Sequence, residues 1–182
     1  ILNRNVASAK EDIELASKLT MILSKKRATE YNDWVLVGWL LHNIDETLLA
    51  TFIKFSKQCP TKYQDGCCEK LWRESEYTDL GIKTLHYWAR MDNPEEYSKI
   101  MSERVNPLLI EAESGQHDNI AKVIYELYKH KFVCVSIAKK IWYTFQNHRW
   151  VLSDSAQQLA LVISDEVTKE FAKFASALYG HY

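Results

Sequence analysis

The sequence predicts a mainly α-helical protein, with a helical bundle followed by a second, small α module that carries a β-hairpin. Apolar residues recur at intervals of three and four over most of the chain, as expected for amphipathic helices. Five Gly and three Pro among 182 residues, with 47% hydrophobic residues, are typical of a folded, helix-rich chain. Between residues 132 and 152, β-branched and aromatic residues favour strands instead.

The first module, predicted over residues 1–110, begins with three helices. Residues 8–11 (SAKE) have the spacing of a capping box and start the first helix. Either polar residue of the pair 32–33 can cap a second helix over the apolar run 34–41, and Asp45 can cap a third. All three helices place apolar side chains on one face, which predicts a shared core.

A loop and further helices complete the first module. Residues 59–66 (CPTKYQDG) contain Pro and Gly and predict an exposed basic loop. A short helix follows around Trp72, and a longer helix ends before Pro94. Asn93, with Pro94 at the first helical position, starts a last helix that we expect to fade near Pro107.

The second module is predicted over residues 116–182, after a polar linker at 111–116 (EAESGQ). His117 or Asp118 can start its first helix. Two helices close the chain, and Ser164 is expected to cap the second of them.

The β-hairpin of the second module is expected at about residues 132–152. A two-residue turn at 146–147 would place Tyr143 opposite Trp150. Tyr143, Phe145 and Trp150 would then form the core of the hairpin against the following helices. The alternative is an aromatic platform for flat ligands such as nucleic-acid bases.

Several kinds of catalytic site have no counterpart in the sequence. Neither of the glycine-rich loops that cradle phosphates is present, and the acidic residues fall mainly in first turns of helices and on solvated faces. Cys59, Cys67, Cys68 and His86 lack the paired C-x2-C spacing of a zinc site, and Cys134 lies in an apolar strand. We therefore predict no catalytic residue and no metal site.

Composition also bears on partners and location. The 23 Lys and Arg nearly balance the 24 Asp and Glu, so a polyanion could bind only at a local patch. The longest apolar runs fall short of the roughly 20 residues that span a bilayer, and four cysteines suit a reducing compartment. We expect a soluble, intracellular protein without a membrane partner. Ile1 in place of Met suggests a fragment of a longer chain.

Basic and aromatic residues are the remaining candidates for function. Single-stranded nucleic acid is held by such combinations of charge and stacking, although a solvated lysine face is the simpler alternative. The candidates lie around the loop of the first module and beside the hairpin: Lys54, Lys57, Lys62, Tyr63, Lys139, Lys140, His148 and Arg149. The tryptophans at 34, 39, 72 and 88 fall in apolar helical stripes and are expected in the core.

Three segments of the first module, WVLVGWLLHNI, FIKFSKQ with KYQDGCCEKLWRE, and LGIKTLHYWARMDNPEEY, carry a family resemblance. Together they resemble the helical domain at the C-terminal side of archaeo-eukaryotic primases, the primase C-terminal domain of the second type. The resemblance covers roughly residues 9 to 104. Its motif positions are Trp34, Val37, Gly38, Phe55, Ser56, Lys62, Tyr63, Trp72, Gly81, Ile82, Leu85, Trp88 and Ala89.

The second module resembles the segment that precedes the helicase domain in primase-helicases of poxviruses and other large nucleocytoplasmic DNA viruses. The positions that carry this resemblance are His117, Asp118, Ile120, Ala121, Trp142, Tyr143, Trp150 and Ser164. The resemblance implies a longer viral replication protein that works in the infected host cell. A primase domain would precede this chain, and a hexameric superfamily-three helicase would follow it in the same polypeptide.

The resemblance also implies how the chain contributes to that protein. The magnesium and nucleoside triphosphates of the full-length protein would bind in the flanking domains, so this fragment would need no cofactor and would not itself be an enzyme. Such helical domains hold the single-stranded template and the initiating nucleotide, which adds Lys83 and Arg90 to the candidate contacts. The alternative is a purely structural connector or oligomerisation collar that does not touch nucleic acid.

Overall fold

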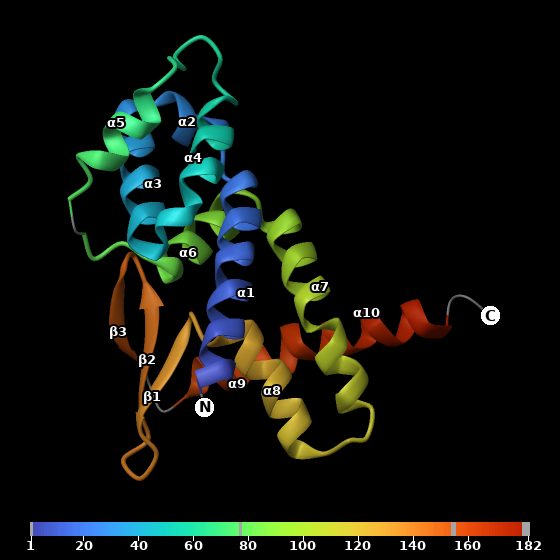
Figure 1. Cartoon of the computed structure of the whole chain (residues 1–182). Coiled ribbons are helices and arrows are strands. Elements are labelled where there is room, and N and C mark those ends of the chain that lie inside the picture. The colour runs from blue at the N-terminus through green and yellow to red at the C-terminus, as the bar shows by residue number, and fades with distance from the viewer. Residues whose placement is uncertain (1, 77, 154–155, 180–182) are drawn as a thin grey trace. The chain divides into compact units, whose positions relative to one another are not determined.

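The structure is a computed structural model that describes residues 2–76, 78–153 and 156–179. The chain forms two compact units, Ile1–Ser98 and Lys99–Tyr182. Helices dominate both units, and a three-stranded antiparallel sheet lies in the second (Figure 1). The mainly α fold class is confirmed, and the expected hairpin is part of this sheet. No helix among the described residues is both long and apolar enough to cross a membrane.

The first unit is built from short helices around an apolar core. Its elements are α1 (Leu2–Met21), α2 (Lys25–Thr29), α3 (Tyr31–Ile44), the 3₁₀ turn η1 (Glu46–Leu48), α4 (Leu49–Ser56), α5 (Cys67–Arg73) and α6 (Ile82–Asp92). The side chains of Leu40, Phe52 and Phe55 are fully buried in its core. Gly38 lies where α3, α4 and α5 meet, since a Cβ there would come within 2.8 Å of both Phe52 and Leu71. Its missing side chain therefore permits the close approach of these helices.

Three helix starts in the first unit test the capping predictions. Asp45 is confirmed as a cap, because its carboxylate accepts a hydrogen bond from the Thr47 amide at 2.9 Å. The predictions for Ser8 and for the pair 32–33 are wrong: α1 is already helical from Leu2, and Glu30 precedes the first turn of α3. Asp33 lies inside that first turn, where its charge complements the helix dipole instead.

Helix α7 (Pro94–Ala112) starts at Pro94 as predicted, with the Asn93 side chain accepting a hydrogen bond from the Glu96 amide. The expected fading near Pro107 is wrong, because the helix continues to Ala112. A proline removes one backbone donor from a helix. On both sides of Pro107, apolar residues of α7 pack in a buried cluster with α8, and this packing offsets the loss. The buried members of the cluster are Val105, Leu109, Ala112 and Val123.

The division between the compact units therefore falls inside α7, after Ser98. The stretch 111–116, expected as the linker, forms the end of α7 and the turn into α8 (His117–Tyr128). Gly115 has a positive φ of 69° in this turn. The assignment of 1–110 and 116–182 as separate domains stays a prediction, whereas the packing groups α7 from Lys99 onward with the second unit.

The sheet of the second unit has the order β1-β2-β3, from β1 (Phe132–Ser136), β2 (Ile141–Gln146) and β3 (Arg149–Ser153). The predicted register is wrong, because the turn lies one residue later in the chain than predicted. The tight turn is at Asn147 and His148, whose φ values are 47° and 62°, so Phe145 pairs with Trp150 and Tyr143 with Leu152. Two positive φ values are typical of the hairpin turn that matches strand twist, and Asn tolerates them better than Gln does.

The last helical segment is continuous through α9 (Gln157–Val162), the π-helical turn η2 (Ile163–Val167) and α10 (Thr168–Tyr179). The prediction that Ser164 caps a new helix is wrong, because its hydroxyl donates to the Ala160 carbonyl at 3.0 Å. The wider turn coincides with a buried position, Val167, which packs with Tyr128 and Phe132. Tertiary packing therefore overrides the local capping signal.

Candidate nucleic-acid interface

A pocket of about 360 Å³ lies in the first unit, beside α2, the start of α3 and the loop between α4 and α5. Three aromatic residues, Tyr31, Trp34 and Tyr63, contribute to its wall. Polar side chains complete much of the lining: Thr29, Ser56, Lys62 and Gln64. The fold thus brings two loop residues predicted as nucleic-acid contacts, Lys62 and Tyr63, beside the aromatic residues Tyr31 and Trp34 of α3.

The indole of Trp34 is held in a fixed position by the core beneath it. Its Nε1 donates to Ser56 Oγ at 2.7 Å, and Ser56 Oγ in turn donates to the Phe52 carbonyl at 2.8 Å. The indole also stacks on the fully buried ring of Phe52, with centroids 5.2 Å apart. Because the indole N–H is already bonded, Trp34 has only ring surface to offer a ligand.

Tyr31 extends the aromatic wall toward the solvent. Its ring lies 6.1 Å from that of Trp34, at an interplanar angle of 35°, and its side chain is 71% exposed. The two residues are one helical turn apart on α3, so the helix itself sets their spacing. The sequence prediction missed this pair as a site, because it placed Trp34 in the core and gave Tyr31 no role.

Positive charge lies at the same loop. Lys62 Nζ donates to the Thr29 carbonyl at 2.6 Å, which ties the loop to the end of α2. The ammonium group of Lys57 lies 5.4 Å from the centre of the Tyr63 ring, and Lys54 is exposed on the last turn of α4. Partial burial, with the nearby Asp65 carboxylate, raises the pKa of the Tyr63 hydroxyl.

The cysteines near the pocket differ in reactivity. Cys67 lines the pocket and is half-buried, whereas Cys68 is fully buried beside Ser56. Burial raises the pKa of the Cys68 thiol to about 12, so the thiolate that binds metals or attacks electrophiles is scarce there. Over residues 2–76, 78–153 and 156–179, no three His, Cys, Asp or Glu residues are grouped so that they could hold a metal ion.

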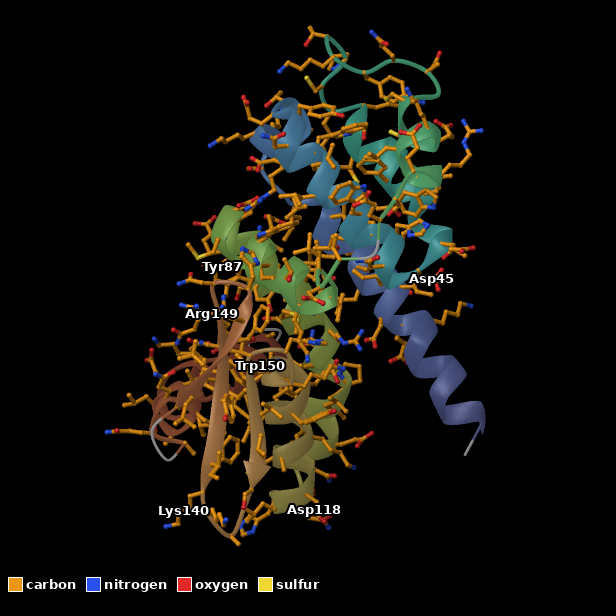
Figure 2. The ribbon with its side chains drawn as sticks, turned by 90° about the vertical axis from the view of Figure 1, so that its left-hand side faces the viewer. Asp45, Tyr87, Asp118, Lys140, Arg149 and Trp150 are labelled. Carbon is orange, nitrogen blue, oxygen red and sulfur yellow. The ribbon has the colours of Figure 1, made fainter. Side chains whose placement is uncertain are left out.

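The remaining predicted contacts do not join this pocket. Lys83 and Arg90 lie half-buried on α6. In the second unit, Lys139 and Lys140 lie in the loop between β1 and β2, and His148 and Arg149 lie at the turn between β2 and β3. Figure 2 shows Lys140 and Arg149 at opposite ends of the sheet. The four exposed side chains therefore form two separate groups.

The aromatic residues of the sheet fit a packing role better than a platform. Phe145 is buried, and its ring meets Trp150 edge to face with centroids 5.3 Å apart. Tyr143 and Trp150 are half-buried. Of the tryptophans predicted in the core, Trp72 and Trp88 are buried, while those at 34 and 39 are half-buried.

Comparison with known sequences finds a family match within the first unit. Residues 16–89, which include α2 to α5 and the pocket, match the family described as Primase C terminal 2 (PriCT-2). The predicted family resemblance is therefore confirmed, and the PriCT-2 segment contains every side chain that lines the pocket.

Viral relatives extend the similarity beyond the PriCT-2 segment. The chain is 40% identical over 179 residues to a "Putative helicase" of Acanthamoeba polyphaga mimivirus, covering 96% of this chain and 18% of that protein. It is 31% identical over 141 residues to a "Putative primase" of African swine fever virus, covering 70% of this chain and 15% of that protein. A "Putative helicase" of Frog virus 3 is 26% identical over 161 residues, covering 85% and 16%. The chain thus spans less than a fifth of the length of these relatives.

Proposed function

We propose that this chain is a non-catalytic segment of a viral primase-helicase, and that its PriCT-2 domain holds single-stranded template for primer synthesis. The observation that carries the proposal is the pocket, where Lys62 and Tyr63 lie beside Trp34 and Tyr31. Single-stranded DNA is bound by a positively charged surface together with rings on which bases stack. Both elements occur around this pocket, with Lys54 and Lys57 adding charge nearby.

The benefit of such a domain is proximity. A template strand held by a domain tethered to the polymerising site has a high effective concentration there, without any new contact at the reaction centre. The polymerising and nucleotide-hydrolysing centres, with their magnesium and nucleoside triphosphates, would lie in the rest of the primase-helicase. The second unit would join the primase to a helicase ring, which we expect to be a hexamer in the infected cell.

A purely structural connector is the second candidate function. The near balance of 23 basic and 24 acidic residues supports it, because the chain as a whole does not attract a polyanion. On this alternative, the exposed lysines only keep the surface solvated, and the partners of the chain are its flanking domains and neighbouring subunits.

DNA binding at two salt concentrations separates these candidates. We expect labelled single-stranded DNA to bind the chain at low salt and to bind more weakly as salt rises. Changing both Lys57 and Lys62 to Glu should lower the affinity at least tenfold, and the loss of two phosphate contacts should flatten the logarithmic salt dependence by about 1.4. Both side chains are exposed, so the unit should keep its fold, and circular dichroism and the melting temperature check that losing the Lys62 bond to the Thr29 carbonyl leaves it folded.

A matched control is the double change of Lys10 and Lys18 to Glu on α1, which alters the net charge equally. Both lysines are exposed, and Lys18 makes only a surface ion pair with Glu14. This control should keep most of the affinity. If the chain fails to bind DNA at low salt, or if both double variants lose affinity equally, template holding at the pocket is refuted and the connector is favoured.

A further inference from the structure

We propose that the pocket receives one unstacked nucleobase of the single-stranded template, and that it does not hold a nucleoside triphosphate. This inference rests on the proposed function and deepens it, because template and initiating nucleotide are different ligands. The choice between them follows from what the wall of the pocket offers to a base and to phosphate.

The wall suits the flat face of a base. The indole of Trp34 is locked by Ser56 and Phe52, and its N–H is bonded, so it presents a rigid apolar surface. Tyr31 and Tyr63 add two further rings. Stacking on aromatic rings tolerates any base, since each base has a π-face. A volume of about 360 Å³ is at the small end of ligand pockets.

Polar groups at the same wall can meet the edge of a base. Gln64 carries an amide with both donors and an acceptor, as the edges of bases require. The Thr29 hydroxyl, which donates to the Lys26 carbonyl at 2.9 Å, keeps its lone pairs for a donor on the ligand. These groups can hold a base edge, but they are too few to enclose a sugar with three phosphates.

The charge of the wall argues against a triphosphate. Among the described lining residues, Lys62 is the one cation, and since one of its three N–H donors already bonds the Thr29 carbonyl, two remain for phosphate. No Asp or Glu belongs to the described lining, so the wall offers no carboxylate to hold the magnesium of a bound nucleotide. Triphosphate sites instead rely on several cations or on glycine-rich loops. One phosphate of a DNA strand carries one charge and fits Lys62 with Lys57 nearby.

Cys67 provides a reporter inside the pocket. It is a half-buried lining residue, while Cys59 and Cys68 are buried. Alkylation with iodoacetamide, mapped by mass spectrometry, should therefore modify Cys67 readily and Cys68 hardly at all. Cys134, half-buried in β1 of the second unit, serves as an internal control for general effects of DNA on alkylation.

The deciding experiment compares three probes on the 182-residue chain. The first is an oligothymidylate, the second is an abasic oligodeoxyribose phosphate of the same length and charge, and the third is ATP with or without magnesium. We expect the oligothymidylate to bind about tenfold tighter than the abasic strand and to protect Cys67 but not Cys134. The abasic strand and ATP should leave Cys67 reactive.

Two variants place the base contact at the pocket. Tyr31→Ala removes a ring that is 71% exposed, so folding should be unaffected, and it should weaken oligothymidylate binding about fivefold without changing abasic-strand binding. The control is Tyr125→Ala in the second unit, where the ring is 66% exposed and lies outside the pocket. It should leave both affinities unchanged.

The outcomes separate this inference from the proposed function. Equal binding of both strands with Cys67 left reactive would overturn the base pocket while leaving template holding intact. Protection of Cys67 by ATP as strong as that by the oligothymidylate would overturn it in favour of a nucleotide site. Absence of binding by either strand at low salt would refute the proposed function, and the base pocket with it.

Discussion

The contact between α2 and α6 gives the sharpest test of how the first unit holds the pocket. Arg27 donates from Nε to Asp92 Oδ2 at 2.6 Å and from Nη2 to Oδ1 at 3.0 Å, with 19% and 11% of the two side chains exposed. The same carboxylate accepts the Ser24 amide at the start of α2, and the guanidinium lies 4.5 Å from the ring centre of Trp88. Because α2 ends in pocket residues, this contact also positions the pocket wall.

The perturbation is Arg27→Met, which keeps much of the aliphatic stem and removes the charge. Breaking a largely buried ion pair by deleting one partner costs about 3 kcal/mol when some solvent remains. The lost contact with Trp88 is included in that figure. For a chain of this length, the loss should lower the melting temperature by about 10 °C. Arg27→Lys should fall between wild type and Arg27→Met, because Lys keeps the charge but cannot donate two parallel bonds.

The pH dependence separates this pair from simple packing. Burial alone would raise the pKa of Asp92, but the hydrogen bonds from Arg27 and Ser24 outweigh it and lower that pKa. A carboxyl with a lowered pKa stabilises the fold above its unfolded pKa, about 3.9, and this contribution is lost as the pH falls through the folded value. The difference in stability between wild type and Arg27→Met should therefore be full at pH 7 and shrink below about pH 4.

Thermal unfolding followed by circular dichroism at 222 nm, from pH 7 to pH 2.5, measures this difference. Asp92→Asn should lower the melting temperature by a similar amount at pH 7, and the melting temperature of this variant should change less between pH 4 and pH 2.5 than that of the wild type. A drop of less than about 2 °C for Arg27→Met at pH 7, or a difference that stays constant down to pH 2.5, would show that the ion pair does not stabilise the unit.

Two further predictions concern packing and charge elsewhere in the chain. Gly38→Val should destabilise the first unit by about 2 kcal/mol in urea unfolding, because the added atoms meet Phe52 and Leu71, and an unchanged midpoint would contradict the close packing. Glu126→Gln should destabilise the second unit by about 1 to 2 kcal/mol at neutral pH, since the carboxylate pairs with Arg104 at 17% and 16% exposure. Burial alone would raise the pKa of Glu126, but the hydrogen bonds from Arg104 and Lys129 outweigh it and lower that pKa. The loss caused by Glu126→Gln should therefore shrink as the pH falls below about 4, and a loss that stays constant in acid would exclude the ion pair as its cause.

Most helices of the first unit could be predicted from local patterns, and so could two of the pocket residues, but the short helix α2 was not predicted. The spacing of apolar residues gave the helix positions, and the Asp45 and Asn93 signals gave two of their starts. Lys62 and Tyr63 stood out because charge and aromatic character lie together in one exposed loop. These features depend on residues within one or two turns of each other, where the covalent chain fixes the neighbours.

The rest of the pocket could not be predicted from local patterns. Trp34 follows an apolar stripe and is expected in the core, but it is half-buried and lines the pocket beside Lys62 and Tyr63 of the loop after α4. Local patterns also fail to predict that α7 continues through Pro107 and that the last helix continues through Ser164. In both helices, burial of distant apolar partners outweighed a local signal worth about 1 to 3 kcal/mol.

By itself, then, the sequence determined the helical character of the chain, the resemblance of residues 16–89 to the PriCT-2 family and the chemistry available to the chain, because periodicity, motif spacing and residue types are properties of neighbouring positions. Only the tertiary structure decided that Tyr31 and Trp34 of α3 share a cavity with Lys62 and Tyr63, which lie in the loop between α4 and α5. The physical reason is that a pocket is defined by where packing stops. That depends on how helices of fixed shape meet around Gly38 and Phe52, which no local pattern encodes.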